Sequence, residues 1–130
     1  MIKKVLHLII ILLFLVGSCV LEEVVVNNYL NDIDTKVAYI QGYVSGKEDI
    51  NTSEIFSLVQ NLEDNWDKKE RVLCLIVNHK DIEDIGLEIS RMKSNCATNQ
   101  IEDFNASLAL IRFYTQAYHH VMGTNVYNVL

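Results

Sequence analysis

Residues 55–76 read IFSLVQNLEDNWDKKERVLCLI, and their apolar positions recur every three or four residues. This spacing is typical of an α-helix that buries one seam against its neighbours. The seam comprises Ile55, Val59, Leu62, Trp66, Lys69, Leu73 and Ile76. Lys69 is its one polar member, and we expect its aliphatic stem to pack along the core while its amine stays in solvent.

Similar seams precede and follow this helix. They comprise Val26, Leu30, Ile33, Val37, Ile40 and Val44; then Ile82, Ile85, Ile89, Met92 and Cys96; and finally Ile101, Phe104, Leu108, Ile111, Thr115, Tyr118 and Met122. Short polar turns separate the seams, so consecutive helices are expected to run antiparallel. The predicted fold is all-α, with an N-terminal membrane helix followed by an antiparallel bundle of about four helices.

Capping residues set the expected helix ends. Asn51 and Asn99 are each followed three residues later by glutamate, which is the spacing of a capping box at a helix N-terminus. Asn78 lies in a tight turn that begins a new helix. Gly123 is the expected residue just past the end of the last helix, because glycine readily adopts the left-handed conformation found there.

The N-terminus carries a hydrophobic segment. Lys3 and Lys4 precede an aliphatic run from Val5 to Leu21, and the acidic pair Glu22–Glu23 follows it. A run of about 17 residues is the lower limit for a helix that crosses a bilayer. Because basic residues flank the cytoplasmic end of a span, everything downstream is predicted to lie outside the cytoplasm. We predict a membrane segment over residues 1–21 and an extracytoplasmic helical domain over residues 22–130.

The same segment has a second interpretation. A basic start and an apolar run that ends in small residues also describe a signal peptide. Val16–Cys19 reads VGSC and resembles a bacterial lipobox, in which Cys19 would become the lipidated first residue. An uncleaved anchor and a lipoprotein signal therefore remain alternatives, and both tether the domain to the same face of the cell membrane.

Charge and cysteine spacing exclude several functions. The chain has a net charge of −6, and the nine basic and 17 acidic residues after the hydrophobic segment leave that part at −8. An acidic domain repels nucleic acid, so no nucleic-acid partner is expected.

Cys74 and Cys96 would lie about 18 Å apart along the bundle axis at 1.5 Å per residue, too far for a disulfide. We find no catalytic constellation or cofactor motif, and predict neither an enzyme nor a cofactor.

Histidines suggest one candidate metal site. With the last turn near residues 98–99, antiparallel pairing would gather His79, Asp81, His119 and His120 at the membrane-proximal end of the bundle. Imidazole and carboxylate groups are common ligands of zinc and other transition metals. His79, Asp81 and His120 are the candidate ligands. The alternatives are that His79 is a turn residue and that His120 is a partly buried residue bonded to a carbonyl or a carboxylate.

A candidate partner surface lies at the same end. Residues 72–77 are apolar on all sides, which indicates a segment that is either enclosed or in contact with lipid. The residues assigned to this surface are Trp66, Val72, Leu75 and Val77. For Trp66 the structural explanation, a large core residue, comes first, and a partner-facing role is the alternative. An integral membrane protein or a second copy of the chain would be the partner.

Several stretches resemble a known family. They are Trp66–Leu73, His79–Ile82 and Tyr118–Gly123, together with the N-terminal segment and the overall length. In these the chain resembles the uncharacterised domain-of-unknown-function family 4363, short membrane-tethered helical proteins of Gram-positive bacteria. The resemblance implies a membrane anchor rather than lipidation, and implies no activity.

Two functions follow as hypotheses. The first is a non-catalytic interaction or accessory subunit tethered to the membrane, because the chain has an apolar segment and no group suited to chemistry. The alternative is a ligand- or metal-responsive sensor that uses His79, Asp81 and His120.

Overall fold

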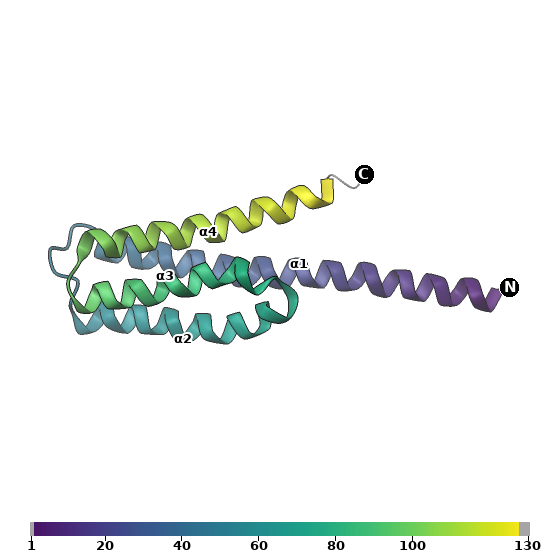
Figure 1. The fold of residues 1–130 in the computed structure, drawn as a ribbon, viewed down its shortest axis with the longest axis horizontal. Coiled ribbons are helices and arrows are strands. Elements are labelled where there is room, and N and C mark those ends of the chain that lie inside the picture. The colour runs from purple at the N-terminus through teal and green to yellow at the C-terminus, as the bar shows by residue number, and fades with distance from the viewer. Residues whose placement is uncertain (1, 128–130) are drawn as a thin grey trace.

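The computed structural model describes the backbone of residues 2–127 and the side chains of residues 3–78, 80 and 82–118. It contains four helices, α1 (Ile2–Val44), α2 (Ser53–Ile76), α3 (His79–Ala97) and α4 (Ile101–Tyr127). Each helix packs against the next along the chain, and α4 packs back against α1. The described chain is therefore a four-helix bundle with antiparallel neighbours, from which the N-terminal half of α1 projects alone (Figure 1).

The hydrophobic segment and the first bundle helix are one element. We predicted a membrane helix followed by about four bundle helices, but α1 runs from Ile2 to Val44 without interruption, so the structure has four helices in total. The physical reason is that nothing breaks the helix. The chain contains no proline, and a single glycine such as Gly17 disfavours a helix by only about 1 kcal/mol.

The predicted seams form the core. On α1, all six seam residues are 0–5% exposed. The other helices contribute a buried set that comprises Ile55, Val59, Leu62, Trp66, Leu73, Ile82, Ile85, Ile89, Met92, Cys96, Phe104, Leu108 and Ile111. The three-and-four spacing was therefore a correct guide to the face that each helix buries.

The helix starts at residues 53 and 101 differ from the predicted capping boxes. Thr52, in an extended conformation, is the N-cap of α2, and its Oγ1 accepts a hydrogen bond from the backbone N–H of Ile55 at 3.2 Å. Asn99 has a positive φ of 54° and uses its Oδ1 to accept the backbone N–H of Ile50 at 2.9 Å. The box at Asn51 was wrong because Thr52 caps α2 instead, and the box at Asn99 was wrong because the Asn99 side chain bonds across to another loop. The predicted turn at Asn78 is confirmed, since its side chain accepts from the N–H of Lys80.

The end of the bundle far from the N-terminus is held by contacts between its two loops. Asn51 donates from Nδ2 to the carbonyl of Ala97 at 3.2 Å, and the Cys96 thiol donates to the carbonyl of Ile50 at the same distance. Gly46 has a φ of +75°, a conformation that glycine adopts at no steric cost, where the chain leaves α1. These contacts fix how α1 and α2 meet α3 and α4.

The last helix is longer than predicted. Its backbone continues through Gly123 to Tyr127. One glycine in a helix is tolerated when the residues on both sides favour helix, so Gly123 was a weak stop signal. As a result, α4 extends to the end of the bundle from which α1 projects, and its C-terminal part diverges from α1 (Figure 1).

Candidate functional site

The projecting half of α1 is exposed on all sides. Every large apolar side chain from Val5 to Leu21 is 47–75% exposed, because no other helix covers this stretch. The helix is long and apolar enough to cross a membrane, and an N-terminal signal sequence has the same length and composition. An uncovered surface of this kind is stable in lipid and unstable in water.

Polar groups within the segment bond to its own backbone. The His7 ring nitrogen Nδ1 donates to the carbonyl of Lys3, and the Ser18 hydroxyl donates to the carbonyl of Phe14, both at 2.8 Å. In hydrocarbon, polar groups need partners inside the protein, since no water is available. Cys19 is exposed on this segment.

Leu75 is an exposed apolar residue at the end of the bundle from which the hydrophobic segment projects. It is 86% exposed, whereas Val72 is half-buried and Trp66 and Val77 are buried at 1% and 9%. Of the four residues assigned to a partner surface, Leu75 thus presents most of the accessible apolar area.

Interhelical contacts set the height of Leu75 along α1. The Lys69 amine on α2 contacts Asp32 on α1. Because α1 and α2 are antiparallel, the residue six positions after Lys69 lies level with the residue six positions before Asp32. Leu75 is therefore within about one helical turn of Val26, the first buried residue of α1. The turn that follows it, between α2 and α3, lies at the end of the bundle where α1 enters (Figure 1).

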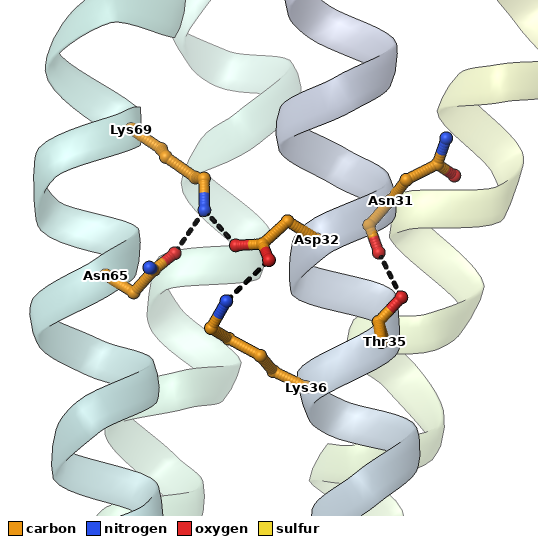
Figure 2. A network of polar contacts seen from close by, with 6 residues as sticks. All are labelled: Asn31, Asp32, Thr35, Lys36, Asn65 and Lys69. Atoms are coloured by element: carbon orange, nitrogen blue, oxygen red, sulfur yellow. Dashed lines mark hydrogen bonds and ion pairs between the residues drawn. The ribbon is translucent and has the colours of Figure 1, made fainter.

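A polar network, drawn in Figure 2, fixes the level at which α2 packs along α1. Asp32 lies between Lys36 of its own helix and Lys69 of α2, and the Lys69 amine also contacts the amide oxygen of Asn65. These two lysines lower the pKa of Asp32, with the hydrogen bond from Lys36 as the largest cause. The prediction that the Lys69 amine stays in solvent was wrong, because the partner carboxylate belongs to a different helix.

A second polar contact joins α4 to α1. The Arg112 guanidinium contacts Asp34 at 3.2 Å and donates to the amide oxygen of Gln41 at 3.1 Å. Thr115, fully buried, donates its hydroxyl to the carbonyl of Arg112 at 2.9 Å. Both networks satisfy polar groups at helix interfaces, and we assign them a structural role.

A cleft of about 560 Å³ lies between α2 and α3. Its charged lining comprises Glu63, Asp67 and Glu70 from α2 and Lys80, Glu83 and Asp84 from α3. Trp66 and Gly86 form part of its wall. Glu63 makes an ion pair with Lys93. The other four carboxylates make no ion pair or hydrogen bond with any side chain that the structure describes.

The tryptophan in this wall has an unsatisfied donor. Trp66 is 1% exposed, and within the described part of the chain its Nε1 is the one buried side-chain nitrogen or oxygen without a hydrogen-bond partner. Nε1 packs against the backbone of Gly86, since a Cβ added there would lie 2.8 Å from it and 3.7 Å from Glu70 Oε1. Sequence reasoning missed this site. The available signal was a glycine inside a predicted helix, which often has a packing reason.

The predicted metal site remains a prediction. The side chains of His79, Asp81 and His120 lie outside the described residues. Among the side chains that are described, no group of three His, Cys, Asp or Glu residues is arranged to hold a metal ion. The backbone places His79 at the start of α3, and His120 lies in the C-terminal part of α4.

A comparison with known protein families identifies the family of this chain. Residues 23–129 match the family described as domain of unknown function DUF4363, and the chain belongs to that family. No curated protein and no solved structure matches the chain. Family membership therefore carries no activity over to these residues, and function has to be argued from the geometry.

Proposed function

We propose that this DUF4363 protein is a membrane-tethered, extracytoplasmic helical bundle that serves as a non-catalytic accessory subunit of an integral membrane protein. The observation that carries the proposal is the place of Leu75. A leucine that is 86% exposed beside an exposed hydrophobic helix has no partner within the described bundle. Contiguous exposed apolar surface usually marks a site of contact with protein or membrane.

The orientation in the membrane rests on charge. Lys3 and Lys4 precede the hydrophobic segment, and Glu22 and Glu23 follow it. This asymmetry supports a cytoplasmic N-terminus and an external bundle. Because α1 is continuous, the bundle would stand close to the membrane surface with no flexible linker between them.

This geometry favours a partner in the same membrane. The turn between α2 and α3 and the C-terminal part of α4 lie on the side of the bundle from which the hydrophobic segment projects (Figure 1). An external loop of a neighbouring membrane protein would meet Leu75 at that level. Tethering both proteins in one bilayer raises their effective concentration, so a small contact is sufficient.

Site-specific photo-crosslinking in intact cells tests the proposal. A benzophenone amino acid replaces Leu75 in one variant and Asn61, which is exposed on the same helix, in the other. We expect a discrete adduct with one integral membrane protein from position 75 and none from position 61. The captured protein should co-purify with the unmodified chain and should be lost with Leu75→Ser. Adducts with lipid alone, or the same adducts from both positions, would contradict an accessory role.

A further inference from the structure

We propose that two copies of the chain pair side by side in one membrane through the outer seam of α1, on the side of the helix opposite the core. The outer seam consists of residues that recur every three or four positions, namely Ile10, Phe14, Gly17, Leu21, Val24, Asn28, Asn31, Thr35, Ala38 and Gly42. It runs from the hydrophobic segment into the bundle on one uninterrupted helix. The inference uses the membrane tether proposed above and is independent of the contact at Leu75.

Two seams lie on opposite sides of α1, and the bundle covers one of them. The inner seam, from Val26 to Val44, is buried. The outer seam has the same seven-residue repeat, offset by two residues, so it stays on the other side of the helix. Its large apolar members are 50–75% exposed, and its members beyond Val24 are exposed except for the half-buried Ala38. A second seam with the period of a packed helix indicates a contact with another molecule.

The outer seam contains no charged residue, in contrast to the exposed surface of α2 and α3. After Lys3 and Lys4 at its start, α1 carries charges only at positions off the seam, which are Glu22, Glu23, Asp32, Asp34 and Lys36. Among the described side chains, the exposed charges on α2 and α3 are Glu54, Asp64, Asp67, Lys68, Arg71, Lys80, Glu83, Asp84 and Arg91. Depletion of charged residues is typical of the central part of a protein interface.

A second copy of the chain suits this seam because the membrane aligns the two. Both copies enter the bilayer in the same direction and to the same depth, so a two-fold axis along the membrane normal places each seam residue level with its counterpart. A charged residue there would face a like charge, which is unfavourable, and the seam has none. With nine basic and 17 acidic residues after the hydrophobic segment, two copies that meet through their charged faces would repel each other.

Asn28 and Asn31 provide polar groups that can pair with themselves. A side-chain amide both donates and accepts hydrogen bonds, so each asparagine can bond to the same residue of the second copy. Asparagine within the seam of a coiled coil fixes the register and the number of strands. In lipid, close packing holds helices together, and the seam there presents Phe14, Gly17 and Leu21. A Cβ added at Gly17 meets nothing within 4 Å, so a second helix has room to approach.

Cysteine crosslinking of the full-length protein in membranes locates the contact. In a Cys19→Ser background, Asn28→Cys and Thr35→Cys each place a thiol on the seam, where facing Cα atoms would lie within the roughly 7 Å that a disulfide allows. Asn61→Cys on α2 and Gln116→Cys on α4 are matched controls at exposed, uncharged positions off the seam. Oxidation with copper phenanthroline should link the seam variants into dimers. The controls should give no more dimer than the Cys19→Ser protein itself.

Substitutions that add charge test whether the seam holds the copies together. Asn28→Asp with Thr35→Asp places like charges face to face, whereas Asn61→Asp with Gln116→Asp adds the same charge off the seam. Förster transfer between donor- and acceptor-labelled full-length proteins in phosphatidylcholine vesicles reports the dimer fraction at each protein-to-lipid ratio. The seam pair should raise the dissociation constant about tenfold or more. The control pair should leave it close to that of the unmodified protein, and circular dichroism should show both pairs folded.

Three results would overturn the proposal. If either seam cysteine gives no disulfide-linked dimer, the copies do not meet at this seam, and the same conclusion follows if the control cysteines give as much dimer. If the charges on the seam weaken association no more than the control charges do, the seam does not hold the copies together. None of these results bears on crosslinking from Leu75, which lies on α2, so the two proposals fail separately.

Discussion

Gly86 of α3 lies so close to Trp66 of α2 that a Cβ atom at residue 86 would stand 2.8 Å from the indole Nε1. Real Cβ atoms do not approach a neighbour this closely, so one of the two helices or the ring would have to move. The indole is buried and its ring is rigid, which leaves little room for adjustment. The contact between α2 and α3 therefore depends on glycine at this position.

We expect Gly86→Ala to destabilise the bundle. Overpacking in a core typically costs about 1–3 kcal/mol, and the better helix propensity of alanine offsets up to about 1 kcal/mol of that. The net loss should be about 1 kcal/mol, measured by urea unfolding of the full-length protein in nanodiscs. Gly42→Ala is the matched control, because a Cβ at residue 42 meets nothing within 4 Å. A Gly86→Ala variant as stable as Gly42→Ala would contradict the close contact.

Leu73 and Leu75 lie two residues apart on α2 in opposite environments, with exposed fractions of 0% and 86%. Leu73→Ala should cost about 2–5 kcal/mol, as removal of a buried leucine side chain does. Leu75→Ala should change the free energy of unfolding by less than about 0.5 kcal/mol. Unfolding of both variants by the same method provides the check. A large loss at Leu75 would mean that this side chain is already covered in the isolated protein.

Most of the fold was predictable from the sequence, and most of the candidate cleft was not. The seams were predictable because burial recurs with the period of a helix, as in the run from Val26 to Val44. The contact between Lys69 and Asp32 depends on the rotation of two helices that are distant in sequence. The close contact at Gly86 depends in the same way on how α3 packs against Trp66. Local spacing describes one helix at a time and carries no information about such pairings.

The stability contributed by Asp32 should depend on pH. Lys36 and Lys69 lower its pKa below the ordinary value of 3.8, so the folded state favours the ionised carboxylate. This contribution to stability is present in full above pH 3.8, and it is lost as the pH falls through the lowered pKa of Asp32 in the folded state. Asp32→Asn should therefore lower the melting temperature at neutral pH, and the difference from the unmodified protein should shrink in acid.

The control for Asp32 is Asp103→Asn, which removes an exposed carboxylate at the start of α4. The effect of Asp32 should be modest, because its side chain is 39% exposed and water and salt weaken such pairs. A melting difference that does not change with pH would contradict the assigned ion pairs.

Cys96 should react with maleimide only when the protein unfolds. It is fully buried, its thiol donates to the carbonyl of Ile50 at 3.2 Å, and burial raises its pKa. Each of these lowers the fraction of accessible thiolate, which is the reactive form. Mass spectrometry after labelling of native and urea-treated protein measures this difference. Asn61→Cys, at an exposed position on α2, should label in the native state. Rapid native labelling of Cys96 would show that the loops at this end open readily.

The uncleaved anchor and the lipoprotein predict different masses for the same membrane-bound protein. Cleavage before Cys19 would remove 18 residues and add a lipid to its thiol, whereas an anchor keeps the chain whole. We expect the whole chain, because α1 continues through Cys19 into the bundle without a break and its internal hydrogen bonds suit a helix that stays in lipid. Intact mass spectrometry of the protein extracted from membranes distinguishes the two. Cys19→Ser should then change the mass only by the substitution itself and should leave the membrane attachment unchanged. Release of this variant into the soluble fraction would establish lipidation instead.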